Sequence, residues 1–229
     1  MSSVLLVHGA WQDSRIWKSV SDLWTLEVPL TAVDLPSTSG HGTLANDAAY
    51  VITVAATLRP PIIVVAHSYG GAVVTQAAAS VDKLAGVMYV AAFKPELGVS
   101  VTDTSKRAPR VSDLDRAIYR ESDQLFLREE AINALYDDPE PAVRDLFASR
   151  HPQPLATFRN PVTSEVPRGV PTHYVVCTND RAVIVELQEE MAQTCSSRSQ
   201  LPASHCPHVE AATAFVGVLS TFVREEASK

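Results

Sequence analysis

The sequence is short of several features that would indicate particular classes of protein. Its only cysteines are Cys177, Cys195 and Cys206, out of 229 residues, and their spacing fits neither a disulfide framework nor a metal-binding motif. No apolar run approaches the roughly 20 residues that span a bilayer. The first residues also lack the basic segment and long apolar stretch of a secretory signal. We therefore expect neither a membrane protein nor a secreted disulfide scaffold, and we expect a reducing, cytoplasmic location.

Positive charge is outnumbered by negative charge. The chain has 19 Lys and Arg residues against 26 Asp and Glu residues, for a formal net charge of −7. This balance disfavours nucleic acids and anionic membranes as partners, because both select for basic surfaces. Hydrophobic residues make up 46% of the chain, which is enough to bury a sizeable core at this length. We expect a globular protein whose partner is a small molecule, and the sequence leaves monomer and homodimer open.

Short apolar runs alternate with longer helical patterns, which is typical of βαβ units around a parallel sheet. Strands of a parallel sheet are buried on both faces and therefore read as nearly continuous apolar runs. Such runs predict strands at residues 3–7, 28–33, 62–66, 86–91, 172–177 and, more weakly, 198–201. Helical periodicity predicts helices at residues 14–24, 44–58, 69–80, 182–194 and 211–223.

The stretch 94–167 interrupts this alternation. It holds most of the Arg, Asp and Pro residues and contains amphipathic pieces at 113–120, 129–136 and 141–148. It is too poor in continuous apolar runs to bury a large core of its own. The sequence therefore predicts one α/β domain with a mostly parallel sheet, formed by residues 1–93 and 168–229, and a helical cap insertion at 94–167.

Ser68 lies where a predicted buried strand passes into a predicted helix. It is the centre of the quintet Ala66-His67-Ser68-Tyr69-Gly70. In a G-x-S-x-G elbow the residues two before and two after the serine must be small, because strand and helix approach closely around a strained turn. Gly70 meets this requirement, and Ala66 replaces the first glycine with one added methyl group. The pattern predicts that Ser68 is a nucleophile at the carboxyl edge of the sheet, where open α/β sheets bind ligands.

A serine hydroxyl needs a base, usually histidine, and a third group that holds the base. With this kind of elbow the chain order is serine, then acid, then histidine. His205 follows the last predicted strand, and Asp180 follows the strand predicted at 172–177, so they are the predicted base and acid. Asp180 could alternatively cap the following helix. His208 fits the base position less well and is a candidate for lining the pocket or starting the final helix.

The first predicted strand also ends in a tight turn, His8-Gly9-Ala10-Trp11. An oxyanion hole needs two preorganised backbone N–H groups. We expect them from Ala10 and from Tyr69, the residue after the nucleophile. His8 is expected to brace the loop.

Substrate preference is expected to come from the cap and from residues beside the turn. The candidate substrate-binding residues are Trp11, Phe93, Phe126, Tyr136 and His208. Leu125, Phe147 and Phe158 are further candidates. Packing within the protein is the alternative role for each of them.

Several segments together resemble a known superfamily. They are LLVHGAW, AVDLPSTSGHG, VVAHSYGGAVV, VMYVAAFKP, YVVCTNDRAVIVELQEEMA and ASHCPH. The chain resembles the α/β-hydrolase superfamily and, within it, is similar to small plant methyl esterases, hydroxynitrile lyases and their bacterial relatives. The resemblance implies the triad Ser68, Asp180 and His205, the oxyanion donors Ala10 and Tyr69, a helical cap and no cofactor.

This resemblance and the residues together favour a serine hydrolase that cleaves an ester of a small, fairly apolar molecule. Hydroxynitrile lyases place a lysine shortly after the catalytic histidine, whereas here His205 is followed by Cys206-Pro207-His208-Val209. A cofactor-free lyase or lactone reaction on the same triad, and a ligand-binding or signalling protein with low turnover, stay open. No metal is expected, since no cluster of His and Cys residues is apparent.

Overall fold

The structure is a computed structural model and describes residues 2–227. Its centre is a six-stranded sheet with the strand order β2-β1-β3-β4-β8-β9, in which every neighbouring pair is parallel. The strands are β1 (Ser3–Val7), β2 (Leu30–Ala32), β3 (Ile62–His67), β4 (Leu84–Val90), β8 (Thr172–Cys177) and β9 (Ser197–Leu201). The predicted parallel sheet is confirmed. The edge strand β2 is shorter than predicted, and it begins just after Pro29, which has no N–H to donate to a ladder.

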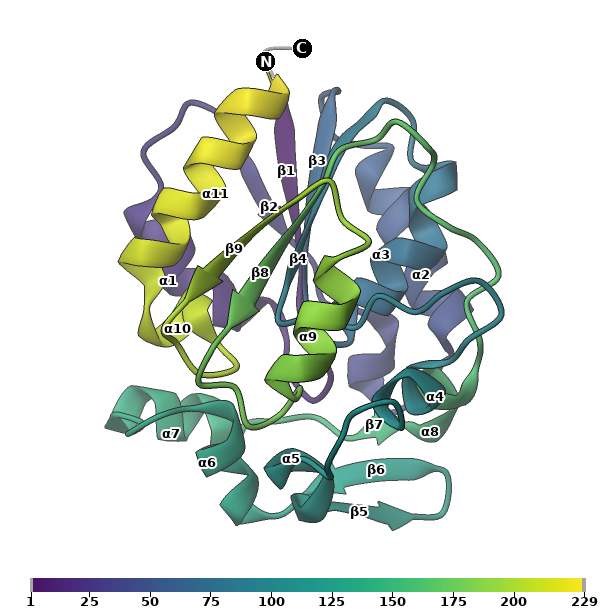
Figure 1. Ribbon diagram of the computed structural model, residues 1–229, viewed down its shortest axis with the longest axis vertical. Helices are drawn as coiled ribbons and strands as arrows, with labels where there is room; N and C mark the ends of the chain where they lie inside the picture. The colour runs from purple at the N-terminus through teal and green to yellow at the C-terminus, as the bar shows by residue number, and fades with distance from the viewer. Residues whose placement is uncertain (1, 228–229) are drawn as a thin grey trace.

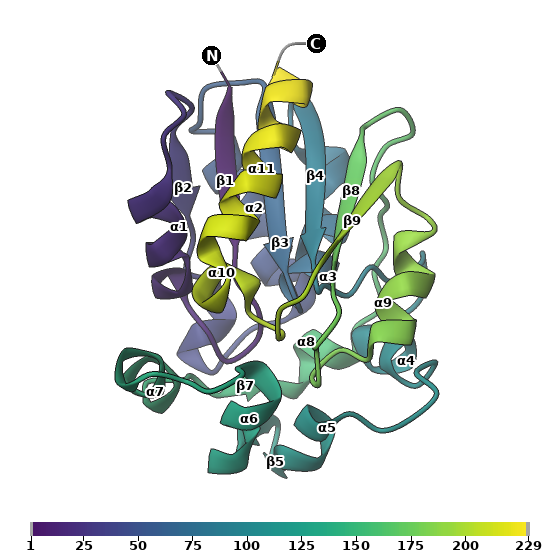
Figure 2. The same ribbon diagram turned by 60° about the vertical axis from the view of Figure 1, so that its left-hand side comes forward.

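Helices cover both faces of this sheet (Figures 1 and 2). They are α1 (Lys18–Leu23), α2 (Leu44–Ala55), α3 (Gly70–Ala77), α9 (Val185–Ala192), α10 (Pro207–Glu210) and α11 (Ala212–Ala227). Short 3₁₀ turns precede α1 (Ser14–Trp17), lie before α2 (Pro36–Ser39) and follow α3 (Ala78–Ser80). Helix α2 begins with a capping box in which Thr43 and Asn46 bond each other's backbone N–H groups, which satisfies donors that the first turn leaves free.

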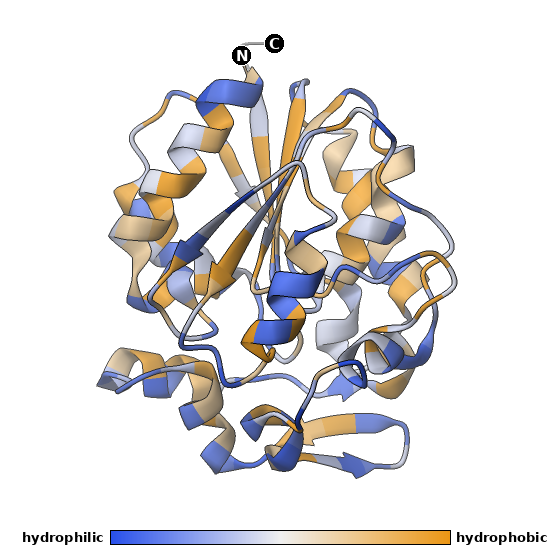
Figure 3. Cartoon of the chain, viewed as in Figure 1, coloured by the Kyte–Doolittle hydropathy of each residue, from blue (hydrophilic) through white to orange (hydrophobic). Residues whose placement is uncertain are grey.

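The strands divide the core into two layers. Val4 and Leu6 of β1 pack with α1 and α11, whereas Leu5 and Val7 pack with α2 and α3 on the other face. This division follows from the alternation of side chains along a strand. All five residues of β1 and all six of β3 are buried, and Figure 3 shows apolar residues concentrated in the strands. The part of the chain that the structure describes contains no helix long and apolar enough to cross a membrane.

The segment between β4 and β8 lies across the carboxyl edge of the sheet (Figure 1). Its helices are α4 (Val101–Ser105), α5 (Asp113–Ala117), α6 (Ile132–Leu135), α7 (Pro141–Ala148) and α8 (Leu155–Arg159), with a 3₁₀ turn at Glu129–Ala131. Its strands β5 (Ile118–Glu121), β6 (Gln124–Leu127) and β7 (Gln153–Pro154) form an antiparallel sheet in the order β5-β6-β7. We call this whole segment the cap.

The expectation of a purely helical insertion is therefore wrong. The helix predicted at 113–120 ends at Ala117, and a β-hairpin follows it. Tyr119 and Phe126 are directly opposite each other in this hairpin, and their rings stack with centroids 5.5 Å apart. Ser122, in the turn, has a left-handed backbone with φ of 51°. Cross-strand aromatic pairs of this kind stabilise hairpins, and they outweigh a local helical pattern.

Candidate active site

Ser68 occupies a strained turn between β3 and α3. Its φ is 52°, in the left-handed region that residues with a side chain rarely adopt. Two of its backbone hydrogen bonds join it to β4 and the residues just after that strand: the Ser68 N–H donates to the Val90 carbonyl at 3.2 Å, and the Phe93 N–H donates to the Ser68 carbonyl at 3.0 Å. The end of β4 thus fixes the turn that presents the serine.

The glycines around the serine allow backbones to approach closely. A Cβ at Gly70 would lie 2.6 Å from the His8 carbonyl oxygen, and one at Gly71 would lie 2.2 Å from the Phe93 carbonyl oxygen. A Cβ at Gly9 would lie 2.9 Å from the Ser68 Cβ. These positions therefore require glycine, and the loop after β1 lies directly against the serine.

His205 is held by Asp180. The His205 Nδ1 lies 2.8 Å from the Asp180 Oδ2, and both side chains are almost completely buried. The carboxylate must accept here, so Nδ1 carries the proton and Nε2 keeps a lone pair. Among residues 2–227, His205 Nε2 has no hydrogen-bond partner, which leaves it free to take a proton from a nucleophile.

Asp180 is itself fully bonded. Its Oδ1 accepts from the backbone N–H groups of Ala182 and Val183 at 2.7 and 3.0 Å, and its Oδ2 also accepts from Gln188 Nε2 at 2.7 Å. Asp180 does not cap the following helix α9, whose N-cap is Ile184; its Oδ1 instead holds the turn that leads into that helix, and its Oδ2 holds His205. These bonds fix the carboxylate that orients His205.

The loop after β1 supplies a second set of backbone N–H groups near Ser68. His8 braces it: its Nδ1 donates to the Gly9 carbonyl at 2.7 Å, and its Nε2 accepts from the Leu35 N–H at 3.0 Å. Burial lowers the pKa of His8, which keeps the ring in the neutral form that can make both bonds. The backbone N–H groups of Ala10 and Tyr69 donate no hydrogen bond to any described residue, so both are available to donate to an oxyanion.

Above Ser68 lies a cavity of about 670 Å³. Trp11 lines it from the loop after β1, and Phe93 and Phe158 line it from the segment between β4 and β8. The Phe158 ring lies between Trp11 and Tyr69, with ring centroids 5.5 and 5.6 Å away. The other apolar lining residues are Ala108, Pro109, Val111, Leu114, Ile118, Leu125, Leu155, Ala182 and Val183. A partly open, mostly apolar cavity of this volume is typical of a site for a small molecule.

Four of the predicted pocket residues lie elsewhere. Phe126 lies beside a separate surface groove with Gln124 and Asp123. Its neighbour Leu125 lines the Ser68 cavity, and successive side chains of a strand point to opposite faces. Sequence reasoning named both residues but could not assign the face, because that depends on the orientation of the unpredicted hairpin.

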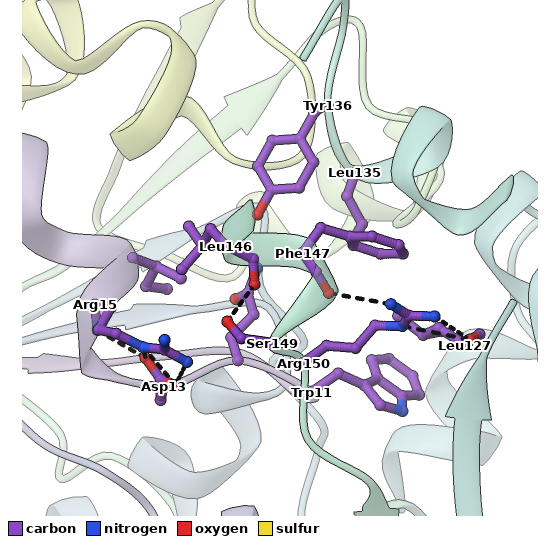
Figure 4. Close-up of a pocket in the computed structure, with 12 residues that line it drawn as sticks. Trp11, Asp13, Arg15, Leu127, Leu135, Tyr136, Leu146, Phe147, Ser149 and Arg150 are labelled. Atoms are coloured by element: carbon purple, nitrogen blue, oxygen red, sulfur yellow. Dashed lines mark hydrogen bonds and ion pairs between the residues drawn. The ribbon is translucent and has the colours of Figure 1, made fainter. Parts of the chain in front are cut away.

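Tyr136 and Phe147 line a separate, small cavity of about 20 Å³ together with Trp11 and Arg150 (Figure 4). His208 is fully buried in the core and packs on Trp17 with ring centroids 4.5 Å apart. Neither Tyr136 nor His208 lines the Ser68 cavity, so both predictions of substrate contact are corrected. Ala182 and Val183, which sequence reasoning missed, could have been found because they lie two and three residues after Asp180.

A cluster of His and Cys side chains also lies beside the site. His67, Cys206 and His208 are all buried, and one potential ligand atom from each lies within 4.8 Å of the others. The expectation that no such cluster exists is therefore wrong. The cluster was not predicted from the sequence, because His67 is far along the chain from the other two residues.

The chain matches known proteins over nearly its whole length. The probable hydrolase R7 of Phoma sp. (strain ATCC 20986 / MF5453) is 26% identical, over 90% of this chain and 91% of that protein. Among solved structures, a pyrethroid hydrolase from Sphingobium faniae JZ-2 matches with a TM-score of 0.82 at 19% identity, over 100% of both chains. A methylesterase from Arabidopsis matches with a TM-score of 0.76 at 20% identity, over 98% of this chain and 99% of that one.

These structural likenesses show the fold. The sequence model described as "Alpha/beta hydrolase family" matches residues 4–218, which include the elbow, the loop after β1 and the segments that carry Asp180 and His205. The protein therefore belongs to the α/β hydrolase family.

Proposed function

We propose that this protein hydrolyses a carboxylic ester of a small, fairly apolar molecule through an acyl-enzyme on Ser68. The observation that carries the proposal is the combination of a strained serine at the floor of an apolar cavity with a buried His205–Asp180 pair at 2.8 Å. Relatives in fold include a pyrethroid hydrolase, a polyneuridine aldehyde esterase and a methylesterase. Their names support ester cleavage as the reaction.

In the first half of the reaction, His205 Nε2 takes the Ser68 hydroxyl proton while Oγ attacks the ester carbonyl carbon. The carbonyl π electrons move to oxygen, and the N–H groups of Ala10 and Tyr69 donate to the resulting oxyanion. Asp180 stabilises the imidazolium that forms. The tetrahedral intermediate then expels the alcohol, which leaves with the proton from His205.

In the second half, His205 takes a proton from water as the water oxygen attacks the acyl carbon. The second intermediate collapses and releases the acid, and His205 returns its proton to the Ser68 oxygen. The cavity supports an apolar substrate, because most of its lining is apolar and its charged residues, Lys106, Arg110, Asp115 and Arg159, all belong to the cap. The four residues that follow His205, Cys206-Pro207-His208-Val209, include no lysine, which favours hydrolysis over a lyase reaction.

The test compares wild type with Ser68→Ala on p-nitrophenyl and methyl esters of increasing acyl length. We expect turnover by wild type and a loss of roughly 10³-fold or more in kcat for Ser68→Ala, as expected for removal of a nucleophile. Ser105→Ala is the matched control, since Ser105 lines the same cavity from the cap and has no part in the reaction. A fluorophosphonate should label wild type at Ser68, as detected by peptide mass spectrometry.

Two results would overturn the proposal. One is equal ester turnover by wild type and Ser68→Ala, which would mean that the serine is not the nucleophile. The other is rapid labelling of Ser68 by the fluorophosphonate without turnover of any ester, which would favour a ligand-binding or signalling role.

A further inference from the structure

His208 is a buried side chain whose hydrogen-bonding capacity is unused. It is fully buried, and neither its Nδ1 nor its Nε2 has a hydrogen-bond partner in the described part of the chain. Buried polar groups in native proteins are nearly always bonded, so an exception calls for a physical reason. Burial lowers the pKa of His208 to about 3, so the ring is neutral and carries a free lone pair.

Two more potential metal-ligand atoms lie close to the His208 ring. A ring nitrogen of His67, the sulfur of Cys206 and a ring nitrogen of His208 all lie within 4.8 Å of one another. Nitrogen and sulfur ligands of one tetrahedral Zn²⁺ lie roughly 3.3–3.7 Å apart, given bond lengths of about 2.0–2.1 Å and about 2.3 Å. A closure of about 1 Å would therefore bring the three atoms to coordination distance.

His67 already has the outer contact that is usual for a metal-bound imidazole. Its Nε2 lies 2.9 Å from the His205 carbonyl oxygen and must donate to it, which leaves Nδ1 with a lone pair. Such a bond from the second nitrogen fixes the orientation of a ligating histidine. Burial also lowers the pKa of His67 well below its usual value, so the ring is neutral and able to coordinate.

The Gln12 side chain closes the cluster on the remaining side. Its Oε1 lies 3.1 Å from His67 Nδ1, and its Nε2 lies 3.4 Å from Cys206 Sγ. In this orientation of the amide, the Gln12 oxygen lies beside a ring nitrogen that also offers a lone pair. A cation bound to both atoms would make the Gln12 oxygen a fourth ligand.

Cys206 completes the donor set as a thiolate. Burial raises the pKa of its thiol, while hydrogen bonds with Gln12 and Tyr136 oppose that rise. A bound divalent cation deprotonates a coordinating thiol outright, and the proton leaves to solvent. Two neutral imidazoles and one thiolate then give a site with a net charge of +1.

We propose that His67, Cys206 and His208 form a binding site for a zinc-like divalent cation, with Gln12 as the fourth ligand. Imidazole and thiolate ligands together select zinc and similar borderline-soft metals over magnesium and calcium. The site is separate from the Ser68 cavity, but His67 directly precedes Ser68 and Cys206 directly follows His205 in the chain. A bound cation would thus tie together the two segments that carry the nucleophile and the base.

The test titrates chelator-treated full-length protein with Co²⁺, a coloured substitute for Zn²⁺, and then displaces it with Zn²⁺. We expect one equivalent to bind with a thiolate-to-cobalt charge-transfer absorption, a rise in Tm with either metal, and loss of the absorption when Zn²⁺ is added. Cys206→Ser should abolish the absorption. His208→Leu should weaken binding by roughly 100-fold or more, since even loss of an outer-shell partner costs 10–100-fold.

Cys195→Ser is the matched control, because Cys195 is also a free thiol but lies outside the cluster, and it should bind Co²⁺ like wild type. His208 has no hydrogen-bond partner to lose, so His208→Leu should keep the Tm of the metal-free protein. This result would separate loss of binding from loss of folding. The proposal is overturned if metal-free wild type binds no stoichiometric Co²⁺ or Zn²⁺. It is also overturned if the absorption survives Cys206→Ser or disappears in Cys195→Ser.

Discussion

Asp180→Asn tests the arrangement that holds His205. Asp180 Oδ1 accepts from the Ala182 and Val183 N–H groups, and Oδ2 accepts from Gln188 Nε2 and His205 Nδ1. Asparagine keeps one acceptor oxygen and replaces the other with an NH₂ group. When the oxygen serves the two backbone groups, the NH₂ faces two donors, and His205 can bond to it only in the tautomer that carries its proton on Nε2.

In that tautomer Nε2 cannot accept the Ser68 proton. The same substitution in the serine-protease triad lowers kcat about 10⁴-fold, which corresponds to about 5.4 kcal/mol at 1.36 kcal/mol per factor of ten. We expect kcat/KM for a p-nitrophenyl ester to fall about 10³–10⁴-fold. Each lost hydrogen bond to the carboxylate also removes roughly 1.5–3 kcal/mol of stability, so the rate must be measured well below the Tm of the variant.

Asp137→Asn is the matched control. The Asp137 carboxylate is about half exposed and pairs with Arg181 at 2.8 Å, and an exposed pair of this kind contributes about 0–1 kcal/mol. We expect its kcat/KM to equal that of wild type. The reasoning is refuted if Asp180→Asn, folded by circular dichroism, keeps kcat/KM within tenfold of wild type.

Two further predictions concern stability, measured by urea unfolding. Gly71→Ala should cost roughly 1–3 kcal/mol or more, because its Cβ would lie 2.2 Å from the Phe93 carbonyl oxygen. Gly217→Ala, in open space on α11, should instead gain about 0.5–1 kcal/mol, and the opposite order would contradict the close approach. Burial raises the pKa of Asp47, which accepts from the Tyr69 hydroxyl at 2.8 Å. The folded state therefore holds this proton more tightly, and the stability that Asp47 contributes should fall as pH rises from 3.8 through its folded pKa. Asp47→Asn should lack that contribution. If the variant and wild type show the same dependence of stability on pH, the prediction for Asp47 is wrong.

The sequence predicted the parts of the fold that a strong local pattern specifies. The run 172–177 coincides with β8, and the run 62–66 falls one residue short of β3, since buried parallel strands leave an uninterrupted apolar run. The elbow at Ser68 was readable because close backbone approach demands small residues at fixed spacing. Asp180 and His205 followed from chain order along strand ends, and the structure brings their side chains into contact.

The parts that the sequence did not predict depend on contacts between distant segments. Whether Leu125 or Phe126 lines the cavity depends on which face the hairpin turns toward the core, and one residue of register reverses the answer. The burial of His208 depends on Trp17, nearly 200 residues earlier in the chain. No rule of sequence spacing predicts a contact between such distant residues, so the environment of His208 is known only from the folded structure.

The cap does more than cover the cavity, because it is bonded to the loops that carry the candidate catalytic groups. Trp11 follows Ala10 in the loop after β1, and its φ of 62° is strained for a bulky residue. The cap holds it through three hydrogen bonds: its backbone N–H donates to the Gln153 side chain, its indole N–H donates to the Leu125 carbonyl, and its carbonyl accepts from the His151 N–H. A cap substitution that disturbs these bonds would displace the Ala10 N–H as well as reshape the cavity. Under the proposed mechanism, we therefore expect cap substitutions that break these bonds to change both substrate preference and stabilisation of the oxyanion.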